Sequence, residues 1–309
     1  MNTRTAASDA VAEGGREGRD AARRGKSLKK RLVHVLDRPG GRFLLGSIAT
    51  YVARSNSGED IAIKYASGLW MRRIGNYFLP DGHNFEYVYD FRSWKEEIAA
   101  RDAAARDYWL RHYQPQDGDV IVDVGAGRGE DTMTFSRAVG VAGRVIAIEA
   151  DPVSFRILSS FCKLNGLKNV TPIHAALMDK PGIVTVVATG SSWTENSVRA
   201  ANLGNGAAVA ALTLDDVCRS ERVHDIAFLK MNIEGAERLA IAGMESVIAC
   251  VRQICIACHD FRWRRGDGDE FRTREHIERF LKYAGFDVVS RSSDPRDYVC
   301  DHLFGVRRY

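Results

Sequence analysis

The sequence has no run of about 18 apolar residues, the length at which a membrane-spanning helix is expected. Its longest apolar stretch, residues 43–53, is short and contains Gly46, Ser47 and Thr50. This stretch follows a basic segment, as the core of a signal peptide does, but it starts too far into the chain for that role. We therefore expect a packed helix at this place and a cytoplasmic protein.

A disulfide framework is also missing, because only six cysteines are spread over the 309 residues. Cys255, Cys258 and His259 superficially suggest a zinc or redox site. However, residues 251–258 have the pattern of a strand, on which residues three apart face opposite sides. No second pair of cysteines supplies the other half of a zinc site. We expect buried structural thiols and no metal site.

Acidic residues are nearly missing from one segment. Residues 22–42 contain eight lysines and arginines and a single acid, Asp37, although the whole chain has a net charge of only +4. Such a basic arm is most often a solvated tail, and weak contact with an anionic membrane is the alternative. We expect no nucleic-acid partner. Residues 1–27 also have almost no large apolar side chains, so we expect them to be disordered.

Three glycines at alternate positions follow a short apolar stretch. Val120 to Val124 forms a β-branched run that predicts a buried strand, and a helical pattern covers residues 131–138. Between them lie Gly125, Gly127 and Gly129. A glycine turn before a helix lets a ligand approach the backbone closely, and the helix start favours anionic groups. The turn therefore predicts a site for a small ligand with a nucleotide-like part.

Strand and helix patterns alternate after this turn. Strands are expected at residues 144–149, 170–174, 226–232, 251–258, 286–290 and 298–306, and helices at residues 152–164, 234–247 and 273–283. Residues 183–188 and 207–214 have the pattern of an inserted pair of strands. Repeated β-α units predict an α/β fold with a mostly parallel sheet that helices cover on both faces. We expect this domain to span residues 94–309, starting with a helix at 94–112.

The preceding residues, 28–93, predict an N-terminal extension of helices and short strands. Helical spacing covers residues 27–36 and 43–54, and an alternating strand pattern covers residues 61–65. A tract rich in aromatic residues follows, between positions 70 and 94. Such a tract more often forms a core than a binding surface, although it could shape a substrate pocket.

Ligands of a parallel sheet bind at the carboxyl ends of its strands, near the point where the strand order reverses. Glu149 lies 24 residues after Gly125, where a carboxylate can accept hydrogen bonds from both hydroxyls of a ribose. A surface carboxylate beside a turn is the alternative for this residue. The predicted cofactor-binding residues are Asp123, Gly125, Ala126, Gly127, Gly129, Glu149, Ala150, Asp151, His174, Ala175 and Asn232.

Two ligand classes compete for the glycine turn. A dinucleotide site has the spacing Gly-x-Gly-x-x-Gly, and it would make the protein an oxidoreductase. Here the spacing is Asp-x-Gly-x-Gly-x-Gly, from Asp123 to Gly129. This pattern resembles the first motif of class I S-adenosylmethionine-dependent methyltransferases. An acid beside the turn suits the ammonium group of that cofactor, whereas a pyrophosphate would avoid it.

A second motif narrows the resemblance. Residues 228–237 read Phe-Leu-Lys-Met-Asn-Ile-Glu-Gly-Ala-Glu and resemble the signature of the FkbM family of methyltransferases, whose usual form is FLK-x-D-x-EGAE. Residues 212–216 and His259, at the end of the next strand, fit the same family. The resemblance covers residues 117–290.

The resemblance implies a class I methyltransferase fold, which is Rossmann-like. Its seven strands would have the order 3-2-1-4-5-7-6, with an antiparallel seventh strand. It also implies S-adenosylmethionine as the cofactor and O-methylation of a hydroxyl, commonly on a sugar, a glycolipid or another natural product. A protein that retains the fold and binds without catalysis is a further alternative.

One position departs from the family, which usually has an aspartate where this chain has Asn232. If that carboxylate is the essential base, asparagine weakens catalysis. If it mainly binds the cofactor or helps hold a metal, asparagine can partly replace it. We therefore do not predict Asn232 as a base, and metal dependence becomes a weaker expectation.

The candidate general bases for an in-line methyl transfer are His259 and Glu234. Histidine has a pKa range suited to that task, although His259 could instead tie the strand end to a neighbouring loop. Glu234 begins an expected helix, where a carboxylate is also a favourable cap.

The candidate acceptor contacts are Arg262, Trp263 and Arg264, which follow the fifth strand, and Trp193 in the insertion. Arginines hold phosphate or carboxylate groups, and aromatic rings can stack on sugars. A solvated basic loop with a packed tryptophan is the alternative.

Overall fold

The computed structural model describes residues 30–66, 68–82, 84–85, 94–187, 197–199 and 206–308. The chain forms two compact units, residues 1–94 and 95–309. The segment predicted to be disordered, residues 1–27, and the predicted acceptor contact Trp193 lie outside the described residues. No helix in the described part is both long and apolar enough to cross a membrane.

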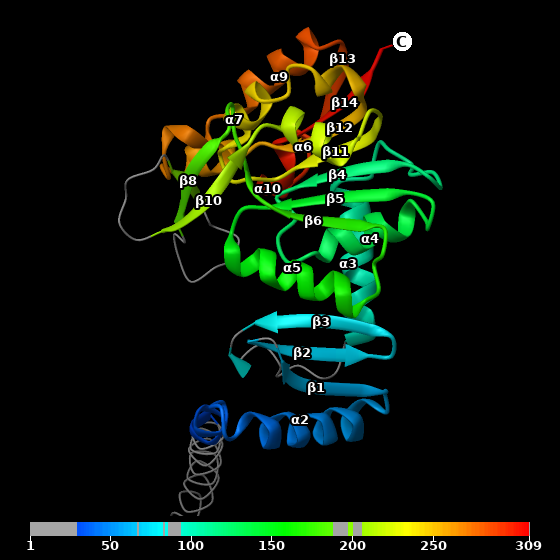
Figure 1. Ribbon diagram of the computed structural model, residues 1–309, viewed down its shortest axis with the longest axis vertical. Helices are drawn as coiled ribbons and strands as arrows, with labels where there is room; N and C mark the ends of the chain where they lie inside the picture. The colour runs from blue at the N-terminus through cyan, green and yellow to red at the C-terminus, as the bar shows by residue number, and fades with distance from the viewer. Residues whose placement is uncertain are drawn as a thin grey trace, which may run out of the picture. The chain divides into compact units, whose positions relative to one another are not determined.

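The N-terminal unit contains one long helix and a small sheet (Figure 1). Its elements are α2 (Arg42–Ser57) and the antiparallel strands β1 (Ile61–Ala66), β2 (Leu69–Ile74) and β3 (Tyr77–Gly82), which pair in that order. A shorter helix covers residues 30–36. The predicted packed helix and the first strand are therefore confirmed.

Asp37 joins separate parts of this unit. Its carboxylate accepts hydrogen bonds from Nε of Arg42 (3.0 Å), Nε1 of Trp70 (2.9 Å) and the amide of Phe85 (2.9 Å). Trp70 is fully buried, and its ring packs edge-on against Phe85. These two members of the aromatic tract thus form core, as expected.

The second unit is built on a seven-stranded sheet with the order β13-β14-β12-β11-β4-β5-β6. The strands are β4 (Val120–Val124), β5 (Arg144–Glu149), β6 (Val170–His174), β11 (Ile226–Met231), β12 (Val251–Ala257), β13 (Phe286–Ser290) and β14 (His302–Arg307). Strand β14 runs antiparallel to the other six strands of this sheet. The strand order and the antiparallel last strand expected from the resemblance are confirmed.

Helices cover both faces of this sheet (Figure 1). They are α3 (Trp94–Tyr108), α4 (Glu130–Ala138), α5 (Pro152–Leu164), α6 (Leu214–Glu221), α7 (Glu237–Ala242), α8 (Asp260–Arg264), α9 (Arg274–Tyr283) and α10 (Asp297–Cys300). Side chains of α3 and α4 pack with one face of the sheet, and those of α6, α7 and α9 pack with the other. Cys255 and Cys258 belong to the hydrophobic clusters on opposite faces of the sheet. The prediction that they face opposite sides is therefore confirmed.

A smaller sheet follows β6. It has the order β7-β10-β8-β9, from β7 (Ala176–Leu177), β8 (Gly182–Val187), β9 (Ser197–Arg199) and β10 (Ala207–Leu212). Strands β8 and β10 are antiparallel, which confirms the predicted inserted pair.

Three predicted elements were wrong in extent. The helix expected at 94–112 ends at Tyr108. The helix expected at 234–247 is reduced to α7, because Glu234 and Gly235 both have positive φ angles (53° and 98°), which no right-handed helix contains. The strand expected at 298–306 starts only at His302, because residues 297–300 form α10.

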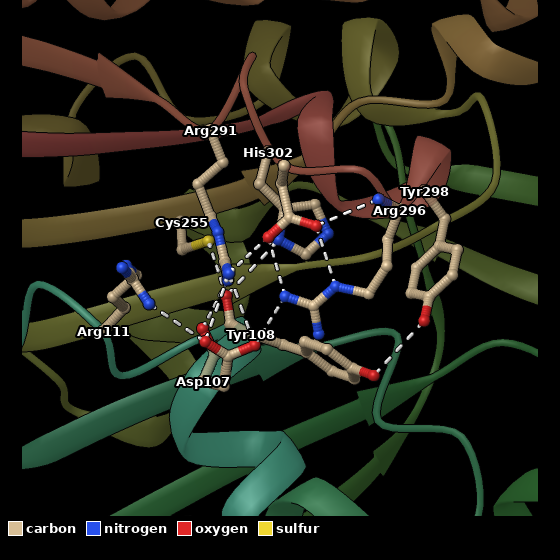
Figure 2. A network of polar contacts seen from close by, with 9 residues as sticks. Asp107, Tyr108, Arg111, Cys255, Arg291, Arg296, Tyr298 and His302 are labelled. Atoms are coloured by element: carbon tan, nitrogen blue, oxygen red, sulfur yellow. Dashed lines mark hydrogen bonds and ion pairs between the residues drawn. The ribbon is translucent and has the colours of Figure 1, made fainter.

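A polar network holds the chain between β13 and β14 against the end of α3 (Figure 2). Arg291 and Arg296 both pair with Asp107 on α3, and both also pair with Asp294. The Tyr298 hydroxyl lies 3.4 Å from that of Tyr108. These contacts explain why Tyr298 does not continue the sheet.

Candidate active site

The three glycines of the turn after β4 serve different purposes, although all have positive φ angles of 73°, 59° and 98°. A Cβ atom on Gly125 would lie 1.9 Å from the carbonyl oxygen of Asn232, and one on Gly129 would lie 2.8 Å from the Phe161 ring. Gly125 therefore permits the close approach of the chain after β11, and Gly129 permits packing of α4 on α5. Gly127 lines a pocket.

This pocket lies where the strand order reverses, between β4 and β11. Its lining consists of Val124, Gly125, Gly127, Ile148, Glu149, Ala150, Asp151, Ser154, Ala175, Ala176, Leu177, Val186, Asn232, Ile233, Glu234 and Ala236. The smaller sheet thus contributes to the wall through β7 and β8.

Glu149 stands at the end of β5 with its carboxylate fixed by two backbone amides. The amide of Gly127 donates to Oε2 and that of Asp151 donates to Oε1, both at 2.7 Å. Burial raises the pKa of Glu149 to about 7, although both amide hydrogen bonds favour the ionised form. The pocket therefore contains an oriented carboxylate with lone pairs left to accept further hydrogen bonds.

The structure brings most of the other predicted cofactor residues to this pocket. Ala150, Asp151 and Ala175 line it, and Asp151 also caps α5 by accepting a hydrogen bond from the Ser154 amide (2.7 Å). Ala126 and His174 do not line it. His174 is exposed and stacks on the ring of Phe155.

Asp123 lies behind the glycine turn rather than in the pocket. Its side chain is fully buried, and its two oxygens accept hydrogen bonds from Nζ of Lys230 (2.8 Å) and the hydroxyl of Thr132 (2.6 Å). The same Lys230 ammonium donates to the carbonyl of Gly125 (2.8 Å). The ammonium group that Asp123 was expected to bind on the cofactor is therefore supplied by the protein itself.

Lys230 is not among the residues predicted from the sequence, although its position in a buried strand could have indicated its role. A lysine within the buried strand β11 is costly unless its charge is paired. Its location predicts a partner acid in the core, and Asp123 is its neighbour across β4 and β11.

Asn232 and Glu234, which follow β11, also line the pocket. Glu234 has a left-handed backbone, which is uncommon for a residue with a side chain and often marks a functional position. Its Oε2 accepts a hydrogen bond from Arg262 (2.9 Å), and its Oε1 lies 3.3 Å from Nε2 of His259. Burial alone would raise the pKa of Glu234, but these two cations lower it.

His259 is buried between two carboxylates. Its Nδ1 lies 2.8 Å from Oε1 of Glu237 and its Nε2 lies 3.3 Å from Oε1 of Glu234. Burial favours the neutral ring, but the two carboxylates outweigh it and raise the pKa of His259 to about 10. An imidazolium has no lone pair to accept a proton. The raised pKa therefore disfavours the predicted role of His259 as a general base at neutral pH.

The remaining predicted acceptor contacts are on or beside α8 and do not line the pocket. Arg262 pairs with Glu234 and with Asp267, and its guanidinium lies over the Phe271 ring. Arg264 pairs with Asp301 (2.8 Å). Trp263 is 37% exposed, and its Nε1 donates to Asp269 (3.2 Å). Arg262 therefore acts on the pocket through Glu234, whereas Arg264 is engaged elsewhere.

The strand order and the glycine-turn pocket define a class I methyltransferase fold. The family model of the methyltransferase FkbM domain matches residues 123–288. The chain belongs to this family, which confirms the resemblance seen in the sequence.

Solved structures with a related fold are distant in sequence. Methyltransferase FkbM from Methylobacillus flagellatus KT is 15% identical over 70% of this chain and 62% of its own, with a TM-score of 0.41. A SAM dependent methyltransferase from Aquifex aeolicus is 18% identical over 68% and 95%, with a TM-score of 0.39. An O-methyltransferase from Bacillus cereus in complex with SAH is 15% identical over 69% and 90%, with a TM-score of 0.41. No curated protein matches the chain.

Proposed function

We propose that the protein transfers a methyl group from S-adenosylmethionine to a hydroxyl oxygen of a sugar, a glycolipid or another natural product. The observation that carries the proposal is that one pocket contains two carboxylates. Glu149 suits the ribose hydroxyls of a nucleoside, and Glu234 lines the same pocket.

The pocket fits the cofactor. Gly127 lines it, and Glu149 is already held in a fixed orientation by two backbone amides. Ala150, Asp151 and Ala175 also line the pocket and are the proposed neighbours of the adenosine group. When bound, S-adenosylmethionine supplies a methyl group on a positively charged sulfur, which is activated for transfer.

Glu234 is the proposed proton acceptor. The oxygen–carbon bond forms as the carbon–sulfur bond breaks, and the hydroxyl proton passes to the Glu234 carboxylate. A hydroxyl becomes strongly acidic as its oxygen bonds to carbon, so a carboxylate with a lowered pKa is still basic enough late in the step. His259 and Arg262 keep Glu234 ionised and oriented. Asn232 is neutral and cannot take this role.

The proposal is tested with Glu234→Gln, which keeps the shape of the side chain. Methyl transfer from radiolabelled S-adenosylmethionine to a panel of hydroxylated acceptors should fall about 10²–10⁴-fold. The dissociation constant of the cofactor, measured by calorimetry, should stay within a factor of about three, because Glu149 and the glycine turn are unchanged.

Asp267→Asn is the matched control, because Asp267 also pairs with Arg262 but does not line the pocket. It should retain most of the activity. Normal turnover by Glu234→Gln would disprove the role of Glu234. Tight binding of NADH, with no binding of S-adenosylmethionine, would instead favour the oxidoreductase reading.

A further inference from the structure

Helix α2 of the N-terminal unit is apolar on both of its faces. No charged residue occurs between Arg42 and Arg54. The inner face, with Leu45, Ala49 and Ala53, is buried within the unit. The opposite face should be polar if it only faced water.

The outer face of α2 is instead lined by large apolar side chains. Leu44, Ile48 and Tyr51 follow the helical spacing of four and three residues and are 53%, 46% and 72% exposed. Phe43 is 88% exposed at the start of the same helix, and Val52 is also exposed. Single exposed apolar residues are ordinary, but a continuous set on one helix marks an interaction surface. We call Phe43, Leu44, Ile48, Tyr51 and Val52 the α2 surface.

Basic residues outnumber acidic residues around the α2 surface. Residues 30–54 contain five lysines and arginines and a single acid, Asp37, which pairs with Arg42. A groove beside α2 is lined by Arg42, Arg54 and Lys64 and by no acidic residue, and Arg54 also pairs with Asp60 outside the groove. The sequence just before residue 30 adds four more basic residues.

We propose that the α2 surface docks on an anionic lipid bilayer, with α2 lying in the plane of the interface. Apolar side chains flanked by lysine and arginine are the combination that interfacial helices use, since the two attractions add. The 16 residues of α2 extend about 24 Å, less than the roughly 30 Å of a bilayer core, so the helix would lie on the membrane. A second copy of this chain fits less well, because pairing two such surfaces would bring like charges together.

The test uses the full-length chain and sedimentation with vesicles. Vesicles of phosphatidylcholine with one quarter phosphatidylglycerol should bind the wild-type protein, and vesicles of phosphatidylcholine alone should bind it at least about tenfold more weakly. The double variant Ile48→Asp/Tyr51→Asp should lose binding to the anionic vesicles by at least about a hundredfold, because two apolar contacts are lost and two repulsive charges are added.

The matched control is Val141→Asp/Tyr283→Asp, which makes the same type of change at two apolar residues of the other unit that are 99% and 94% exposed. It adds the same charge and should bind like the wild type. Circular dichroism and thermal melting show whether each variant is folded.

Equal loss of binding in both double variants would overturn the assignment to α2, because it would reflect net charge alone. Failure of the wild-type protein to bind anionic vesicles would also overturn it. So would a wild-type dimer, seen by light scattering, that Ile48→Asp/Tyr51→Asp dissociates without changing vesicle binding. None of these readouts depends on the proposed methyl transfer.

Discussion

Two buried ionic clusters of the methyltransferase unit have similar parts and different surroundings. The first, behind the glycine turn, pairs Lys230 with Asp123, and both side chains are at most 1% exposed. The second, beyond the ends of β11 and β12, holds His259 between Glu237 and Glu234. Glu234 is 22% exposed and lines the pocket, so only the second cluster offers a charged atom to a ligand.

This difference indicates a structural role for the first cluster and a chemical role for the second. Burial lowers the pKa of Lys230, but Asp123 and Asp131 outweigh this and raise it, so the lysine is charged at neutral pH. Its ammonium fixes the Gly125 carbonyl and therefore the backbone of the turn. The cation of the second cluster is a histidine, whose charge depends on its two carboxylate neighbours. We therefore expect the first cluster to set stability and the second to set reactivity and pH dependence.

The largest effect is expected from Lys230→Met. This change leaves the Asp123 carboxylate buried with the Thr132 hydroxyl as its remaining side-chain partner. Breaking a buried ion pair in this way costs about 3–5 kcal/mol of unfolding free energy. Denaturation by urea measures the loss, and calorimetry should show weaker binding of S-adenosylmethionine because the turn is no longer braced.

The double variant Asp123→Asn/Lys230→Met tests the cause of that loss. Removing both charges should recover part of the stability lost by Lys230→Met, since no uncompensated charge remains. If the double variant loses as much unfolding free energy as Lys230→Met and Asp123→Asn lose together, the two residues do not act as a pair.

A smaller effect, dependent on pH, is expected from His259→Gln. The folded protein raises the pKa of His259 from 6.5 to about 10, because Glu237 and Glu234 outweigh the effect of burial. Such a group contributes stability that is complete below pH 6.5 and is lost as the pH rises through about 10. The difference in unfolding free energy between wild type and His259→Gln should therefore shrink from pH 6 to pH 10. A constant difference would mean that His259 is neutral in the fold.

Much of the fold followed from local sequence, whereas the clusters did not. The strand β4, the glycine turn and the helix α5 with Pro152 at its start have strong local signals. The left-handed turn at Glu234 interrupts a pattern that otherwise predicts a continuous helix. The bond between Lys230 and Asp123 joins residues 107 positions apart, so no local pattern could pair them. His259 was assigned as a base because its residue type fits, but its protonation depends on two carboxylates that the fold brings together.

The smallest effect is expected at Glu149, which lines the same pocket as Glu234. Burial raises the pKa of Glu149 to about 7, whereas the cations beside Glu234 lower its pKa. If the ionised Glu149 accepts the ribose hydroxyls, the affinity for S-adenosylmethionine should rise by up to about tenfold between pH 6 and pH 8, as a proton is lost. Glu149→Gln should bind more weakly at pH 8 and lose this pH dependence. Asp151→Asn, at the neighbouring position in the pocket, should keep it, because asparagine is as good a helix cap as aspartate. A wild-type affinity that is the same at both pH values would place the ribose elsewhere, and it would leave Glu234 as the pocket carboxylate that acts in its ionised form.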